Sequence, residues 1–361
     1  MMNGKERVLA TLRGQETDRL CWSPLIDPYF TSSLPEQGYD ELNIPDAARL
    51  VGADIIERHC PTIRAVEDAA IMHRVEHKAN TELEITETPV GTLTTEKRLS
   101  ATGHTSFVSK HLIVTLEDLK VYQYVVEHTH YETDFVTFRE HAQFISGDGI
   151  ATSSGPMSPL QEFLQTLCGV VKTIYLLRDY PEETKDCFEL MHAQNKAAYR
   201  LLGESPTEVI IDYEDTSSTV ISPTYYRKYC APLIDDYAEI CHDAGKCFIT
   251  HMCGKLQAFS DQIQCGQQDG VDSVCPPTTG DTWVYEARTV WGPEKIILGG
   301  IEPPALVLMN AQETREYVIR VLDQMPTFRR FILSTGDATS HGTPVENLRA
   351  ITEVVQSYPW K

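Results

Sequence analysis

Apolar residues in the second half of the chain recur in short runs separated by amphipathic stretches. From residue 200 onward, five runs rich in β-branched residues alternate with segments whose apolar positions follow helical spacing. Runs of the same character lie within 19–26, 53–59 and 149–155. Eight such units predict a (β/α)₈ TIM barrel, formed as a single domain over residues 1–361. The later strands are expected at 207–212, 247–251, 271–275, 295–300 and 329–334.

Two of the expected helices carry capping signals at their starts. Ser222 followed by Pro223 predicts a helix that begins at Pro223 and runs to residue 244. For the last helix, Thr343 is the expected N-cap, with a proline in the first helical position and a glutamate that closes a capping box.

One segment breaks the alternation of strands and helices. Residues 79–115 alternate polar and apolar positions around a Pro-Val-Gly turn, which predicts an antiparallel hairpin. Helical spacing follows at 116–127 and 132–146. We therefore expect residues 79–146 to form an inserted cap of β-hairpin and helices over one mouth of the barrel.

Composition limits the function classes. The chain has 31 Lys and Arg against 52 Asp and Glu, a net charge of −21, which argues against nucleic acid or an anionic membrane as a partner. No apolar run approaches the roughly 18 residues of a membrane span. The N-terminus lacks an apolar segment behind its charges, so a cytoplasmic location is expected, with the ten cysteines as thiols.

Candidate chemistry lies at the carboxyl ends of the predicted strands, where barrel enzymes build their active sites. His251 and Cys253 follow the fifth strand two residues apart, about 6.5 Å along an extended chain, so both can reach one metal ion. Imidazole and thiolate together suit zinc, which needs a third protein ligand. The alternative is a buried histidine and a small buried thiol. The candidate third ligands are Asp337, Cys275, Glu302 and Glu214.

Other strand-end residues have two readings each. Glu214 is either a general acid facing the pocket or a loop carboxylate that caps the next helix. Asp27 and Tyr29 follow the first strand and are predicted to contact substrate, with Phe30 as a further aromatic wall; packing is the alternative for the aromatic rings.

The chain resembles the uroporphyrinogen decarboxylase superfamily over essentially its whole length. The resemblance rests on stretches that include RVLATLRGQETDRLCWSPL, GPMSPLQEF, ISPTYYRKYCAPLIDDYAEICHDAGKCFITHMCGKL, GVDSVCPPTTGDT and STGDATSHGTPVENLRAI. It is most specific for the methyltransferase branch, whose zinc-containing barrels move methyl groups to or from a corrinoid protein. His251 and Cys253 match the His-x-Cys motif of that branch. Thiol methyltransferases then supply a cysteine where this chain has Asp337.

The resemblance implies the substrate methyltransferase of an O-demethylase system. Such an enzyme would take a methyl group from a small methoxylated compound, often aromatic, and pass it to the cob(I)alamin of a separate corrinoid protein. Zinc on His251, Cys253 and Asp337 would act on the ether oxygen, and Glu214 could deliver a proton. The alternatives are a methylcorrinoid:thiol methyltransferase and a catalytically silent binding barrel. The decarboxylase is disfavoured because residues 20–48 lack the arginines expected for a polycarboxylate. Oligomeric state stays open.

Overall fold

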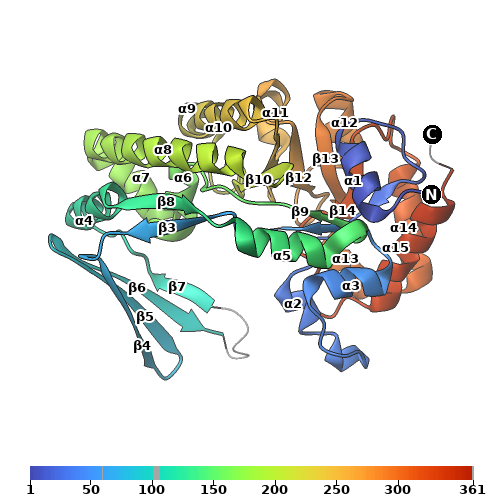
Figure 1. Cartoon of the computed structure of the whole chain (residues 1–361), viewed down its shortest axis with the longest axis horizontal. Coiled ribbons are helices and arrows are strands. Elements are labelled where there is room, and N and C mark those ends of the chain that lie inside the picture. The colour runs from blue at the N-terminus through green and yellow to red at the C-terminus, as the bar shows by residue number, and fades with distance from the viewer. Residues whose placement is uncertain (59, 101–105, 360–361) are drawn as a thin grey trace.

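The computed structural model describes residues 1–58, 60–100 and 106–359. Eight parallel strands follow one another around a barrel, each leading into helical segments on the outside (Figure 1). Their order around the barrel is β1 (Cys21–Trp22), β2 (Ile55–Glu57), β9 (Gly149–Ala151), β10 (Val209–Tyr213), β11 (Cys247–His251), β12 (Gly270–Val274), β13 (Ile296–Ile301) and β14 (Phe331–Thr335).

The barrel closes through two short junctions between its sheets. One sheet of six strands runs from β1 through β14 to β10, and β2 pairs with β9 in a second. Asp54 N donates to Trp22 O at 2.8 Å beside β2, and Ile211 N donates to Ser153 O at 2.9 Å beside β9. The predicted (β/α)₈ barrel with its eight strands is therefore confirmed.

The barrel interior is filled by alternate side chains of the strands. Val209 and Ile211 of β10 and Ile249 of β11 belong to this inner core, and Val8 and Leu12 of helix α1 (Gly4–Leu12) close its amino-terminal end. The residues between them face the helices, because successive side chains on a strand point to opposite faces. This parity decides which strand-end residues reach the barrel mouth.

Helices cover the outside of the barrel, and their starts test the capping predictions. Ser222 Oγ accepts from Tyr225 N and caps the helix that begins at Pro223, as predicted. That helix ends at Tyr229, and the next begins at Ala231, because Pro232 cannot donate a helical hydrogen bond. The outer helices are α3 (Ile44–Val51), α6 (Pro159–Glu162), α7 (Gly169–Asp179), α8 (Pro181–Glu204), α9 (Pro223–Tyr229), α10 (Ala231–Asp243), α11 (Ser260–Cys265), α12 (Val284–Trp291), α13 (Pro303–Leu308), α14 (Ala311–Leu322) and α15 (Val345–Ser357).

The predicted Thr343 cap of the last helix is wrong. Pro344 occupies the N-cap position with extended backbone, and Thr343 Oγ1 has no hydrogen-bond partner among the described residues. The helix starts one residue later than the sequence signal indicates, so the Thr343 hydroxyl does not cap its first turn.

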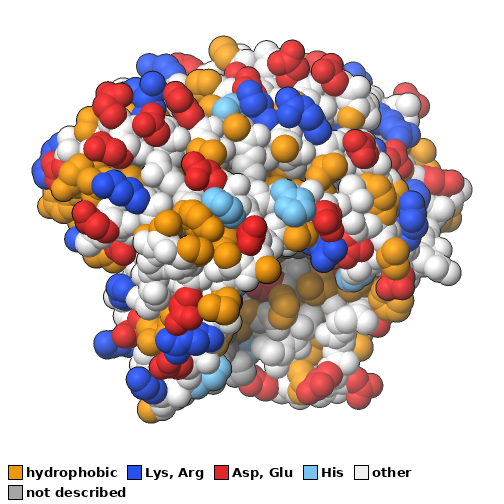
Figure 2. Space-filling view, turned by 60° about the vertical axis from the view of Figure 1, so that its left-hand side comes forward, with side chains coloured by type: hydrophobic (Ala, Val, Ile, Leu, Met, Phe, Trp, Pro, Cys, Tyr) orange, Lys and Arg blue, Asp and Glu red, His pale blue; other side chains and the backbone are white. Residues whose placement is uncertain are grey.

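The segment between β2 and β9 forms a separate layer beside the barrel. Strands β3 (Ile63–Glu67) and β8 (Thr129–Thr133) pair antiparallel, and a four-stranded meander projects from them (Figure 1). In Figure 2 the surface is hollowed beside this projecting sheet. The meander and its helices are β4 (Met72–Lys78), β5 (Thr81–Thr88), β6 (Gly91–Leu99), β7 (Ser106–Lys110), α4 (Leu116–Glu127) and α5 (Phe135–Ile145).

The expected hairpin corresponds to β5 and β6, which meet at the Pro-Val-Gly turn, and the two expected helices correspond to α4 and α5. Ile85 and Leu93 are buried, and Val121 of α4 lies against Gly91. Residues 101–105 of the predicted insertion lie outside the described residues. None of the described helices is long and apolar enough to cross a bilayer.

Candidate functional site

A pocket of about 320 Å³ opens at the carboxyl ends of the barrel strands. Apolar side chains from the segment after β1 form one wall, and polar side chains that follow β2, β10, β11 and β14 form the other. The lining residues are Leu25, Ile26, Asp27, Pro28, Ile44, Ile56, Arg58, Tyr213, Asp215, His251, Cys253, Asp337 and Ala338.

Three potential metal ligands meet in this pocket. One ligand atom each of Asp215, His251 and Cys253 lies within 4.8 Å of the others. His251 ends β11 and is 4% exposed, and Cys253 continues the same inward parity two residues later. Cys253 Sγ donates to Asp215 Oδ1 at 3.3 Å, and His251 Nε2 lies 3.6 Å from the same oxygen. Nitrogen, sulfur and oxygen donors therefore converge on one point.

A buried ion pair fixes the orientation of His251. Its Nδ1 lies 2.9 Å from Asp272 Oδ2, and Asp272 also pairs with Arg58 at 3.0 Å. Asp272 is fully buried; burial alone would raise its pKa, but Arg58 and His251 together hold that pKa well below the usual range. The carboxylate thus keeps the proton on Nδ1 and leaves Nε2 for the cluster, the usual arrangement behind a metal-bound histidine. Tyr213 stacks on the ring at a centroid distance of 4.7 Å.

The charges around Cys253 favour a cation. Burial raises the pKa of its thiol well above the ordinary value, and the carboxylates of Asp215 and Asp337 raise it further. A thiol in this position stays neutral until a positive charge arrives, and a bound metal ion would displace its proton. The donor set of imidazole, thiolate and carboxylate fits zinc with one coordination position left for another ligand.

Asp337 and Asp27 line the pocket outside the three-ligand cluster. Asp337 Oδ1 accepts from Ala338 N at 2.7 Å, and burial raises the pKa of this carboxyl. Asp27 caps the short helix α2 (Pro28–Thr31), since its Oδ1 accepts from Phe30 N at 2.8 Å. Tyr29 is 43% exposed, and its ring packs against His341 at 4.7 Å rather than lining the pocket.

The three other predicted strand-end groups lie apart from the cluster. Glu214 is fully buried and accepts from the backbone and hydroxyl of Ser158, and burial raises its pKa to about 7. Glu302 accepts from Ala305 N at the start of α13 and from two threonines. Cys275 is fully buried and contacts Gly336, and burial raises its pKa to about 12. None of the three lines the pocket.

Asp215 is the potential ligand that was not predicted from the sequence. Val209, Ile211 and Tyr213 face the barrel interior, and the same period of two places residue 215 inward and residue 214 outward. Asp215 adopts a left-handed backbone conformation with φ of 36° directly after β10. Strand parity was therefore the signal that distinguishes the two neighbouring carboxylates.

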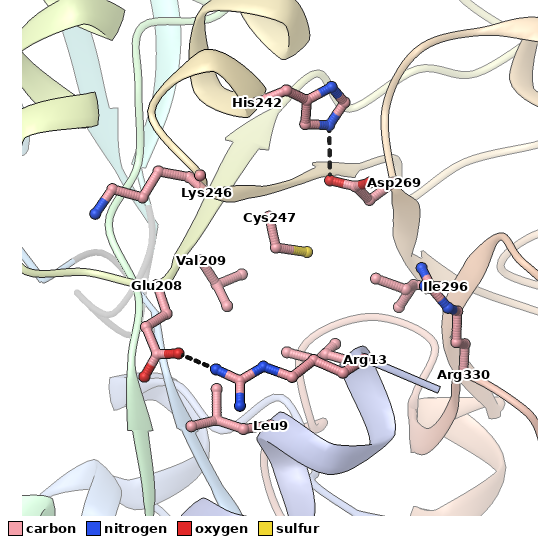
Figure 3. A pocket seen from close by; sticks show the side chains of 12 residues that line it. Leu9, Arg13, Glu208, Val209, His242, Lys246, Cys247, Asp269, Ile296 and Arg330 are labelled. Atoms are coloured by element: carbon pink, nitrogen blue, oxygen red, sulfur yellow. Dashed lines mark hydrogen bonds and ion pairs between the residues drawn. The ribbon is translucent and has the colours of Figure 1, made fainter. Parts of the chain in front are cut away.

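A second cavity of about 260 Å³ lies at the opposite, amino-terminal end of the strands (Figure 3). Its charged side chains are mostly paired: Arg13 with Glu208 at 2.5 Å and His242 with Asp269 at 2.9 Å. This end of a (β/α)₈ barrel contributes to stability, whereas chemistry occurs at the carboxyl ends. We therefore place the functional site at the His251 end.

Comparisons with known proteins identify the family and the fold. A model of the family described as uroporphyrinogen decarboxylase (URO-D) matches residues 109–358. The chain is 28% identical over 148 residues to a methylated-thiol–coenzyme M methyltransferase of Methanosarcina mazei, a match that spans 40% of this chain and only 36% of that protein. A solved methyltransferase structure from Methanosarcina mazei shares its fold, with a TM-score of 0.64, 15% identity and 99% of both chains covered.

Proposed function

Because the chain belongs to the uroporphyrinogen decarboxylase family, we propose that it is a corrinoid-dependent methyltransferase that demethylates a methyl ether, with a methoxylated aromatic compound as the substrate. The observation that carries the proposal is the convergence of Asp215, His251 and Cys253 in the strand-end pocket. The two Methanosarcina mazei methyltransferases support the reaction class.

His251 Nε2, Cys253 Sγ and an Asp215 oxygen are the groups that would hold zinc. When bound, zinc would supply a Lewis acid for the ether oxygen and so weaken its bond to the methyl group. Asp272 keeps His251 in the ligating tautomer, and Arg58 keeps Asp272 ionised. Asp215 takes the place that the sequence analysis gave to Asp337.

Asp337 is the proposed proton donor. A phenolate leaving group has a conjugate acid with a pKa near 10, so its departure is easier when the oxygen is protonated. Asp337 lines the pocket and has a raised pKa, whereas Glu214 is hydrogen-bonded to Ser158 and lies outside it. When the methyl–oxygen bond breaks, the oxygen would keep the bonding electron pair and take the Asp337 proton. A reduced corrinoid on a partner protein would supply the nucleophile that accepts the methyl group.

The pocket suits a substrate with an apolar body and few charges. Leu25, Ile26 and Ile44 provide an apolar wall, and the Arg58 guanidinium is committed to Asp272. With carboxylates at Asp27 and Asp337 on the same lining, a substrate that carries many carboxylates would be repelled. This charge pattern supports methyl transfer over decarboxylation of a tetrapyrrole.

A second candidate function is methyl transfer involving a thiol, which the name of the curated relative favours. Two parallel assays distinguish the two candidate functions. Purified protein is incubated with cob(I)alamin and methoxylated aromatics in one, and with methylcobalamin and small thiols in the other, while corrinoid absorbance is recorded. The proposal expects formation of methylcobalamin from the ether and little reaction with thiols. Turnover of methylcobalamin with thiols alone would replace the ether by a thiol substrate.

A further inference from the structure

A second group of metal-ligand side chains lies outside the barrel, between β2 and α5. Glu57 is the last residue of β2, Cys60 follows three residues later, and His141 lies on α5. One ligand atom of each lies within 4.8 Å of the others. Figure 1 places α5 alongside β9, the neighbour of β2, so the group bridges the barrel wall and the inserted layer.

Glu57 has unused bonding capacity in a buried position. Its side chain is directed away from the barrel interior, and the residue is only 8% exposed. Oε1 lies 2.7 Å from His141 Nδ1, but the buried Oε2 has no hydrogen-bond partner within the described part of the chain. A buried acceptor left without a partner costs free energy, so such an atom calls for an explanation.

Cys60 supplies a soft donor to the same point. It is 1% exposed, and its Sγ makes a long 3.9 Å contact to Glu57 O. Burial, and next the charge of Glu57, raises the pKa of this thiol to about 12. The group therefore combines a neutral thiol, an imidazole and a half-satisfied carboxylate.

We propose that Glu57, Cys60 and His141 form a second metal site, selective for zinc or a similar borderline divalent ion. Oxygen, sulfur and nitrogen donors in this number suit tetrahedral zinc with a water as the fourth ligand, and the 43% exposed His141 side chain gives water access. Tetrahedral coordination needs an N–O separation of about 3.3 Å, from zinc–ligand distances of about 2.0–2.1 Å. The present 2.7 Å must widen slightly as the metal replaces the shared proton.

The site would join the inserted layer to the barrel beside the active centre. Glu57 and Arg58 are consecutive, and their side chains lie on opposite sides of the strand end. Glu57 faces α5, whereas Arg58 lines the mouth pocket and pairs with Asp272. A metal on Glu57 would fix the end of β2 and with it the position of Arg58. This inference does not depend on the proposed reaction.

Metal counting on the full-length protein tests the site. Protein stripped with a chelator is loaded with Zn²⁺ or Co²⁺, passed through a desalting column and analysed for metal per chain. The variants are Cys60→Ser, His141→Ala, Cys253→Ser and the double variant Cys60→Ser/Cys253→Ser. Cys168→Ser serves as a matched control, because Cys168 is a buried thiol outside both clusters. Thermal melts check that each variant folds. If Cys60→Ser does not fold, His141→Ala tests the site in its place, because the His141 side chain is partly exposed.

We expect two metal ions per chain in the wild type and in Cys168→Ser, and one in each single-site variant. The thiolate-to-cobalt charge-transfer band should persist in Cys253→Ser and vanish in the double variant. Two results would overturn the second site. The first is a single metal ion per wild-type chain that is lost in Cys253→Ser. The second is two metal ions per chain in both Cys60→Ser and His141→Ala. One ion that survives Cys253→Ser but not Cys60→Ser would support it while refuting the metal of the proposed function.

Discussion

Replacing Asp272 by asparagine should weaken metal binding at the barrel mouth without removing any ligand. The substitution keeps the shape of the side chain but removes the charge that holds the Nδ1 proton of His251, 2.9 Å away. It also leaves the Arg58 guanidinium, whose side chain is 6% exposed, without its carboxylate partner. Both effects act on the orientation of one ligand.

The size of the effect follows from these contacts. Loss of a carboxylate behind a metal-bound histidine costs about 10–100-fold in affinity, or about 1.4–2.7 kcal/mol. Breaking a buried ion pair by removing one partner costs roughly 3–5 kcal/mol of folding stability. The variant should therefore fold less stably and bind zinc more weakly, as two separate losses.

Zinc affinity can be measured by competition with a chromogenic chelator, in a Cys60→Ser background so that only the mouth site contributes. Asp54→Asn is the matched control, since Asp54 is 3% exposed and pairs with Arg7 and Arg19 away from the pocket. It should lower the melting temperature but leave zinc affinity unchanged. Equal zinc affinity in Asp272→Asn and wild type, or an equal loss in Asp54→Asn, would refute the positioning role.

Three further predictions follow from the structure. Gly254→Ala should lower zinc affinity at least tenfold, because the added Cβ would lie 2.4 Å from the carbonyl oxygen of Thr216, next to Asp215. The control Gly147→Ala should leave zinc affinity unchanged, because its Cβ would make ordinary contacts at 3.5 Å. Asp337→Asn should slow demethylation of unactivated aryl ethers by about 10²-fold or more, and a substrate with an acidic phenol product should lose less; equal losses would contradict acid catalysis. Burial raises the pKa of Glu162 to about 7, above its ordinary 4.5, so the folded state binds the extra proton and the free energy of unfolding should fall as pH rises from about 4.5 to 7. Urea melts of Glu162→Gln should show a smaller fall than the wild type, and the remainder comes from Glu214, whose pKa is also raised to about 7; an unchanged fall would contradict the assignment to Glu162.

The barrel could be predicted because its strands and helices are strongly periodic. Buried parallel strands read as apolar runs, and all eight appear close to their expected positions. The inserted layer was predicted only in part. Its β3, β4 and β8 are mostly exposed or half-buried, so they lack the apolar runs that mark the barrel strands.

The part of the site that depends on residues close together in the sequence could be predicted. His251 and Cys253 share one strand end, and the structure places both in the cluster. To predict the third candidate ligand, the parity of β10 is needed, because it separates Asp215 from Glu214. The support from Arg58 and Asp272 could not be predicted, because these residues are 214 positions apart in the chain and meet only in the closed barrel.

The most direct test of the account compares Asp215→Ala with Asp337→Ala in zinc content and in methyl transfer from a methoxylated aromatic to cob(I)alamin. We predict that Asp215→Ala loses one equivalent of zinc together with activity, whereas Asp337→Ala keeps its zinc and loses turnover. Full activity in Asp215→Ala protein that lacks this zinc, or loss of zinc only in Asp337→Ala, would contradict it.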